Sequence, residues 1–438
     1  MYNDIIKLLN LEQFNLKIQD ISTSKIGMNL FCFITLQRES INCPICNSNL
    51  CNINDYRKKK IKHSISTSNP CYIIYNARRY KCKTCGYVFY ENNPFCSVNQ
   101  KNSTYNVFAV LNKLLSHTVT FTEVAYNLKI SVTTVMRIFD EYVDYSPYYL
   151  PKIMCWDEVY ISRKTSYKYA FVMVDFMKRS IVDIYQSRHK NNVNYNLSRI
   201  PQVQKDKVEY IIIDMWETYR DLAKYHFKNA KIAVDSFHVI QHLNKAMTNI
   251  RIKIMNKYNK KSNTLVNNDM YYYMLKKFHY FFTKKHDDIY NDLIPIRKMG
   301  TKWLKDDIRK YLLDIDDDLK YAYLLKERYR EFNLTAEYET CDEEFNELIN
   351  EFTNSHLNEF REFGKLLRHW KEYIKNSFVK VDGKRLSNGP MEGINSRIKT
   401  IIKSANGYSN FKRLRNRIAY SINKNVPIKG TKIKKNEK

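Results

Sequence analysis

The stretch VEYIIIDMWETYRDLAKYHFKNAKIAVD, residues 208–235, decides the fold of this 438-residue chain. It opens with the apolar run YIII, continues with the helical pattern ETYRDLAKYHF and closes with a second apolar run, AKIAV. Short β-rich runs on either side of a helix are typical of an α/β domain. The stretch therefore predicts a strand, a helix and a second strand of one sheet.

Three more β-rich segments precede this stretch and extend the predicted sheet. They are MCWDEVYIS (154–162), YKYAFVMVDF (167–176) and RSIVDIYQSR (179–188). The turn-like MKR between the second and third predicts a hairpin. We thus expect a three-stranded meander followed by strand, helix and strand, in a mixed sheet with helices. Residues 245–385 carry mostly helical patterns with many charges and predict a helical insertion.

The composition excludes several classes of protein. Hydrophobic residues make up 44% of the chain and aromatic residues 14%, far more than a disordered chain contains. No apolar run approaches the roughly 18 residues of a membrane-spanning helix, and the N-terminal segment does not resemble a secretory signal. We therefore expect a cytoplasmic, nucleoid-associated protein. A net charge of +28 favours a nucleic-acid partner over the alternative, in which lysine only supplies solubility.

Two CxxC pairs lie within the first 100 residues. Their members are Cys43, Cys46, Cys82 and Cys85. This spacing presents four thiolates to one tetrahedral zinc ion, and Gly86 supplies the permissive backbone that such a turn needs. We expect a closed, structural Zn²⁺ site. Two alternatives stay open: the cysteines are buried and unligated, or His63 or Cys71 replaces one of the ligands.

The pattern becomes helical from residue 102 onwards. Thr120 and Glu123 form a capping box at the start of one short helix, and Ser131 caps the next. Two short helices in this order predict a helix-turn-helix, although an ordinary helical hairpin has the same pattern. The second helix would present three side chains to the major groove of DNA: Thr133, Thr134 and Arg137.

Three acidic residues on separate predicted elements are candidates for holding a divalent cation. Asp157 lies in the first strand of the sheet, Asp214 at the end of the fourth, and Glu392 in a late helix. Hard Mg²⁺ or Mn²⁺ prefers carboxylate oxygen, and two such ions can activate a water or a 3′-hydroxyl in phosphodiester chemistry. Asn395 and Lys399 follow Glu392 on the same side of its helix, where we expect them to contact DNA phosphates.

Two further residues, Asp235 and His238, follow the fifth strand and enter a helix. They could support the acid cluster or orient a scissile phosphate, although the pattern around His238 alone favours a structural histidine. Glu158 is adjacent to Asp157 but points to the opposite face of the strand, so we do not include it.

Three blocks resemble the signature blocks of the ISL3 family of bacterial insertion-sequence transposases. They are WDEVYISRKTSYKYAFVMVD (156–175), IIIDMWETYRDLAKYHFKNAKIAVDSFHVIQHLNKAM (211–247) and SNGPMEGINSRIKTIIKSANGYSNFKRLRNRIAY (387–420). The resemblance implies a ribonuclease H-like catalytic domain with a helical insertion, and a DDE triad of Asp157, Asp214 and Glu392. Asp235 and His238 match an Asp-x-x-His signature of related transposases. The ribonuclease H topology favours Asp214 over Asp235 as the second acid.

The resulting fold class is multidomain α+β. The predicted domains are a region with the zinc module (1–100), a helix-turn-helix (101–145), a catalytic core (152–244 and 386–425), a helical insertion (245–385) and a basic tail (426–438). Within the first region, the alternating apolar stretch Lys25–Leu36 predicts a strand.

The leading functional hypothesis is a DNA transposase that binds terminal inverted repeats, cleaves a DNA strand with Mg²⁺ or Mn²⁺ and joins it to target DNA. Because two element ends must be brought together, we expect a homodimer. The alternative is a DNA-binding regulator that has kept an inert catalytic fold. A nuclease that uses the zinc itself is less favoured, because four thiolates leave no open coordination position.

Overall fold

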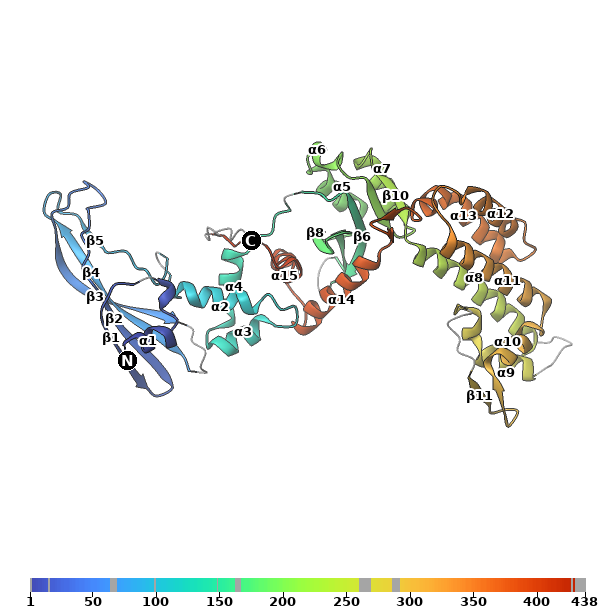
Figure 1. Ribbon diagram of the computed structural model, residues 1–438, viewed down its shortest axis with the longest axis horizontal. Coiled ribbons are helices and arrows are strands. Elements are labelled where there is room, and N and C mark those ends of the chain that lie inside the picture. Colours follow the sequence, from blue (N-terminus) through green and yellow to red (C-terminus); the bar gives the residue numbers. More distant parts are fainter. Residues whose placement is uncertain are drawn as a thin grey trace. The chain divides into compact units, whose positions relative to one another are not determined.

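The computed structural model describes residues 2–14, 16–63, 69–97, 100–147, 149–161, 167–259, 269–285, 292–426 and 428–429 (Figure 1). The chain divides into two compact units. The first comprises Met1–Ser146, Ile161–Ser166 and Ser396–Lys438, and the second comprises Pro147–Tyr160 and Tyr167–Asn395. Most of the basic tail, residues 430–438, lies outside the described residues. No described helix combines the length and the apolar character that crossing a membrane requires.

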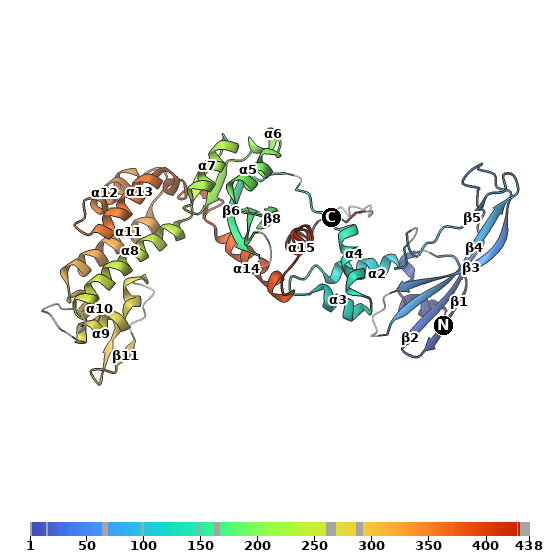
Figure 2. The ribbon, with the colours of Figure 1, turned by 180° about the vertical axis from the view of Figure 1, so that it is seen from behind.

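The first unit begins with a five-stranded sheet of order β1-β2-β4-β3, with β5 paired to β4 (Figure 2). Its elements are α1 Tyr2–Leu8, the 3-10 helix η1 Glu12–Phe14, β1 Ile18–Ile26, β2 Asn29–Leu36, β3 Cys51–His63, β4 Cys71–Cys82 and β5 Val88–Tyr90. The predicted strand Lys25–Leu36 is confirmed from Asn29 onwards, as β2, but its start is wrong: Gly27 has a φ of 59° and the chain turns back there from β1. One face of the sheet packs its apolar side chains beneath α1 and η1.

Four helices form the remainder of the first unit. They are α2 Thr104–Lys113, α3 Phe121–Leu128, α4 Val132–Tyr142 and α15 Phe411–Asn423. The two predicted caps are present: the Thr120 hydroxyl accepts from the Glu123 amide at 3.1 Å, and the Ser131 hydroxyl from the Thr134 amide at 3.2 Å. Lys129 takes the left-handed conformation that ends α3. Apolar residues of all four helices share one core.

Arg417 joins α15 to the helices that precede it by more than 270 residues. Its side chain is 1% exposed. The guanidinium donates to the carbonyl oxygens of Leu114 and Ser116, at 2.6 Å each, and of Val119 at 2.8 Å. These three carbonyl groups lie in the connection between α2 and α3. Arg417 therefore fixes that connection to α15.

We expect Arg417→Met to lower the free energy of unfolding by about 3–5 kcal/mol, because three carbonyl oxygens lose a charged donor in a buried place. Denaturant unfolding of the full chain measures the change. Arg413→Met is the matched control on the same helix: Arg413 pairs with Asp140 near the surface, and its loss should cost about 1 kcal/mol or less. Equal losses from the two variants would contradict the role of Arg417.

The second unit is built on a sheet of order β10-β9-β6-β7-β8 (Figure 1). Its strands are β6 Ile153–Tyr160, β7 Tyr169–Asp175, β8 Ser180–Tyr185, β9 Tyr210–Ile213 and β10 Lys231–Val234. β6, β7 and β8 form an antiparallel meander, whereas β9 runs parallel to β6 and β10 parallel to β9. The predicted meander, hairpin and strand-helix-strand segment are confirmed.

The two faces of this sheet differ in their covering. Three helices lie between the strands in sequence: α5 Lys190–Ser198, α6 Gln202–Lys205 and α7 Glu217–His226. The Trp156 ring contacts Tyr219 of α7 and Phe227, which places α7 on the face toward which Trp156 points. The neighbouring Cys155 points the other way and donates its thiol to the carbonyl oxygen of Ser387, just before α14 Gly389–Ser404.

The predicted helical region packs into the same core as the sheet. Its elements are α8 Ser236–Lys257, α9 Asp269–Lys277, the 3-10 helix η2 His279–Phe282, α10 Lys305–Leu313, α11 Asp317–Thr335, α12 Asp342–Thr353 and α13 Asn358–Asn376. Two short hairpins interrupt it, β11 Leu293–Ile296 with β12 Thr301–Leu304, and β13 Lys380–Val381 with β14 Lys384–Arg385. The helical pattern did not predict these hairpins.

Candidate functional site

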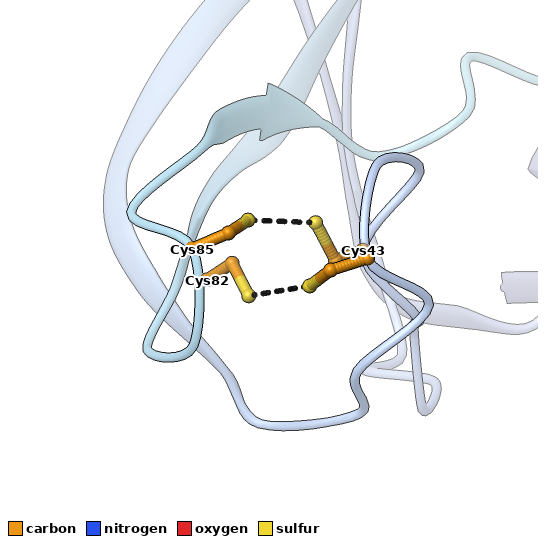
Figure 3. Close-up of side chains that lie close together, drawn as sticks. Cys43, Cys82 and Cys85 are labelled. Atoms are coloured by element: carbon orange, nitrogen blue, oxygen red, sulfur yellow. Dashed lines mark hydrogen bonds between the residues drawn. The ribbon is translucent and has the colours of Figure 1, made fainter.

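The four paired cysteines lie together in the first unit (Figure 3). Their sulfur atoms are all within 4.8 Å of one another, with 3.5 Å between Cys43 and Cys85 and 3.5 Å between Cys46 and Cys82. Sulfur atoms bound tetrahedrally to one zinc ion, each about 2.3 Å from it, are about 3.8 Å apart. These sulfur–sulfur distances lie on either side of that spacing, so the cluster suits one zinc ion.

The two CxxC turns have the same backbone. The amide of Asn47 donates to the carbonyl of Cys43 at 2.9 Å, and the amide of Gly86 donates to the carbonyl of Cys82 at 3.0 Å. Both Asn47 and Gly86 have a positive φ, which Gly86 adopts without strain. Backbone amides of Cys85 and Thr84 lower the pKa of the Cys82 thiol to about 6, which favours the thiolate that zinc binds.

Neither alternative ligand lies in the cluster. His63 contacts the carbonyl oxygen of Leu9 at 2.7 Å and the hydroxyl of Ser103 at 2.9 Å, both in the buried core. Cys71 lies opposite His63 on β4, in the same core. Among the described residues, the four paired cysteines are the one group of three or more His, Cys, Asp or Glu side chains close enough to hold a metal ion.

The predicted acids of the second unit lie on two neighbouring parallel strands, Asp157 within β6 and Asp214 directly after β9. Cys155 of β6 is paired with Ile212 of β9, and Asp157 and Asp214 each lie two residues further along their strands. Since alternate residues of a strand point to the same face, both aspartates lie on the face opposite Trp156. This is the edge at which open α/β sheets place their ligands.

Both carboxyl groups are partly buried, and the burial raises the pKa of each to about 6. The charge of Glu158 adds to both shifts, and Asp157 adds to that of Asp214. The charge of His238 acts in the opposite direction and lowers the pKa of both aspartates. Within the described residues, Oδ1 of Asp214 is buried and has no hydrogen-bond partner. An unpartnered carboxylate oxygen beside a second carboxylate is a donor set that suits a hard divalent cation.

Asn395 holds Asp157 from the neighbouring helix. Its amide nitrogen donates to Oδ2 of Asp157 at 2.8 Å, while Oδ1 of Asp157 accepts from the amide of Glu158 at 2.7 Å. Asn395 is buried, so the structure places it against the acid rather than at the surface where phosphate contact was predicted. The buried Asn388 also reaches this strand and donates to the carbonyl oxygen of Trp156 at 3.5 Å.

Glu158 lies on the other face, as the alternation along the strand predicts. It pairs with Arg188 and accepts from the Tyr219 hydroxyl at 3.2 Å. These contacts hold the negative charge of Glu158 on the face of the sheet opposite the two aspartates.

Asp235 and His238 follow β10 at the start of α8. Burial raises the pKa of Asp235, whereas His238 and the backbone amides of Asn388 and Phe237 favour its charged form. The charge of His238 favours the charged form of Asp157, Asp214 and Asp235 alike.

Glu392 lies in the first turn of α14 and is exposed. Its charge contributes to the raised pKa of Asp235. Within the part of the chain that the structure describes, however, the carboxylates of Asp157, Asp214 and Glu392 are not gathered as closely as the four cysteines. Lys399, further along the same helix, is exposed.

The three predicted DNA-contacting residues of α4 lie near its N-terminus and along its outer side. Thr133 and Arg137 are exposed and Thr134 is half-buried. Both threonine hydroxyls lie within hydrogen-bond distance of the capping Ser131 hydroxyl. Arg137 pairs with Glu141 at 3.3 Å.

The sequence did not predict that Asn395 contacts Asp157. The available signal was the position of Asn395, three residues after Glu392 on the same side of the helix.

Comparison with known families identifies the class of protein that this arrangement belongs to. A family model described as a transposase, of the ISL3 DDE type, matches residues 154–418, from β6 into α15. A second model, the zinc finger of the transposases IS204, IS1001, IS1096 and IS1165, matches residues 39–85. The chain is thus a transposase with an N-terminal zinc-finger region, and its four cysteines support a structural Zn²⁺ site.

The chain belongs to the ISL3 family of transposases. The search of curated proteins finds no match.

Proposed function

We propose that the second unit is a ribonuclease H-like catalytic domain that cleaves and joins DNA strands at the ends of an insertion sequence. The main support is the position of Asp157 and Asp214 on one face of two parallel strands. Both carboxyl groups are partly buried there, and Asn395 of α14 contacts Asp157. A meander followed by two strands parallel to its first strand is the topology expected for that fold.

Asp157, Asp214 and Glu392 would hold the Mg²⁺ or Mn²⁺ that family membership implies. When bound, the ions would activate a water or a 3′-hydroxyl and stabilise the leaving oxygen.

Asp214 is the better second acid than Asp235. Backbone amides favour the charged form of both residues, those of Asn388 and Phe237 for Asp235 and that of Trp216 for Asp214. Oδ1 of Asp214, however, is buried without a hydrogen-bond partner among the described residues and is thus left for a cation. Asp235 and His238 then support the acids: His238 stabilises their charged forms and can hold a proton near the reacting phosphate.

In this proposal the first unit binds the terminal inverted repeats. α3 and α4 form a helix-turn-helix whose Thr133, Thr134 and Arg137 reach the major groove, and the zinc module and the net charge of +28 support phosphate contacts. Lys399 would contact the DNA backbone. A homodimer would bring two ends together.

The test of this function uses the full chain and labelled duplexes that carry the DNA flanking its gene. We expect retardation of these duplexes without metal and strand cleavage on addition of Mg²⁺ or Mn²⁺. Binding that is never followed by cleavage would instead support the regulator with an inert catalytic fold. Failure to bind the flanking DNA in preference to unrelated DNA would overturn both.

Asn395→Leu is expected to reduce metal-dependent cleavage by roughly 10–100-fold, because a neighbour that orients a metal ligand contributes about that much. The lost hydrogen bond normally lowers the pKa of Asp157. The acid limb of the cleavage-pH profile should therefore move to higher pH. Ser396→Ala, one residue away and exposed, is the control and should leave the profile unchanged. An Asn395→Leu profile that falls in height without moving would argue for a packing role only.

A further inference from the structure

The N-terminal sheet has an open face opposite its buried one. In the register of this sheet, Phe31 of β2 lies beside Tyr72 of β4, and Tyr72 lies beside Lys62 of β3. Lys60 is two residues before Lys62 and points to the same side. Two aromatic rings and two lysines therefore share one patch on this face, which we call the Lys60/Lys62 patch.

The rings and the lysines of the patch are in contact. The Phe31 and Tyr72 rings are stacked, with centroids 5.5 Å apart and planes at 19°. The Lys60 ammonium lies 4.3 Å from the Tyr72 centroid and 5.2 Å from that of Phe31, and the Lys62 ammonium lies 4.6 Å from the Tyr72 centroid. The negative ring faces hold two like charges side by side.

Lys62 is the unusual member of the patch. Lys62 as a whole is only 9% exposed. Within the described part of the chain, its Nζ is buried and has no hydrogen-bond partner. Burial lowers the pKa of Lys62, and the nearby charge of Lys60 lowers it further. Neither lysine forms an ion pair with a described carboxylate. A buried, unpaired ammonium is costly to the folded state. A phosphate held by the exposed Lys60 beside it would offset that cost through its negative charge, without direct contact with the buried Nζ.

We propose that the Lys60/Lys62 patch binds phosphates of the duplex DNA backbone. This inference rests on the proposed function, because it assigns the DNA contact of the zinc-containing region to particular side chains. Lys58 continues the row on the same side of β3, and alternate residues of a strand are about 6.6 Å apart. A row of lysines suits an extended polyanion better than a small anion.

The patch favours backbone contact over base stacking. Lys60 already covers both rings, so a base would have to displace its ammonium before it could stack. Phosphate contacts position a protein on DNA without reading sequence. The patch would therefore contribute affinity to any duplex, while specificity comes from elsewhere.

The decisive variant is Lys62→Met in the full-length, zinc-loaded protein. We expect its dissociation constant for a duplex of the gene-flanking DNA to rise roughly three- to tenfold at 150 mM salt, with the slope of log K against log salt lowered by about 0.9. The temperature of unfolding should stay equal or rise, because an unpaired buried charge has been removed. Lys60→Gln, on an exposed side chain, should weaken binding in the same way.

Lys25→Met is the matched control. Lys25 is an exposed lysine of the same sheet that is paired with Leu30, on the opposite face, and its loss should leave both affinity and slope nearly unchanged. The inference is overturned if Lys62→Met and Lys60→Gln bind as Lys25→Met does, or if Lys62→Met lowers the unfolding temperature without changing affinity. If the unmodified protein binds no flanking duplex, the proposed function itself fails.

Discussion

Asp214→Asn is expected to lower metal-dependent strand cleavage by on the order of 10³-fold or more while DNA binding persists. The substitution keeps the shape of the side chain but removes the charge of a carboxylate whose Oδ1 has no partner in the described residues. Loss of several kcal/mol of metal-mediated stabilisation corresponds to an effect of that size. Cleavage of end-labelled flanking duplexes, measured beside gel retardation, separates catalysis from binding.

Two further variants sharpen this experiment. Asp221→Asn removes an exposed carboxylate of the same unit that pairs with Arg220, and it should cleave normally. Asp235→Asn distinguishes the two possible second acids: we expect it to retain Mg²⁺-dependent thermal stabilisation, which Asp214→Asn loses. Cleavage by Asp214→Asn at the normal rate would show that its assignment as a metal ligand is wrong.

Removing zinc is expected to unfold the sheet that carries the CxxC turns. Cys82→Ser deletes one of four ligands, and structural zinc in small domains contributes apparent free energies of about 10–16 kcal/mol. β3 begins at Cys51 and β4 ends at Cys82, and these two residues are paired. The ends of both long strands therefore depend on the cluster. We expect loss of bound zinc, loss of hydrogen-exchange protection in β3 and β4, and loss of DNA binding.

Cys96→Ser is the matched control for the zinc experiment. Cys96 is a buried cysteine of the same unit, but it contacts Asn93 and the carbonyl oxygen of Gln100 and lies outside the cluster. It should retain zinc and most of its stability. A Cys82→Ser protein that still holds zinc and unfolds at the normal temperature would contradict the structural role.

The features that the sequence predicted correctly are those with local causes. The hairpin of β7 and β8 follows from two β-rich runs and a short turn, and the caps at Thr120 and Ser131 each depend on an amide three residues away. The CxxC turns are equally local, because each pair closes over two residues. Where one residue changed the backbone, as Gly27 did within Lys25–Leu36, the apolar alternation alone gave the wrong start of the strand.

The sequence by itself thus determined the strands of the second unit, the two CxxC turns, the capped helices and the positions of the acids along the chain. The tertiary structure alone decided that Asn395 turns inward to Asp157, that Arg417 ties α15 to the carbonyls after α2, and that Lys62 is buried without a partner. Hydrophobic period and capping act over a few residues. A buried polar side chain, in contrast, finds its partner only where distant segments meet, and its burial makes that partner, or the lack of one, energetically decisive.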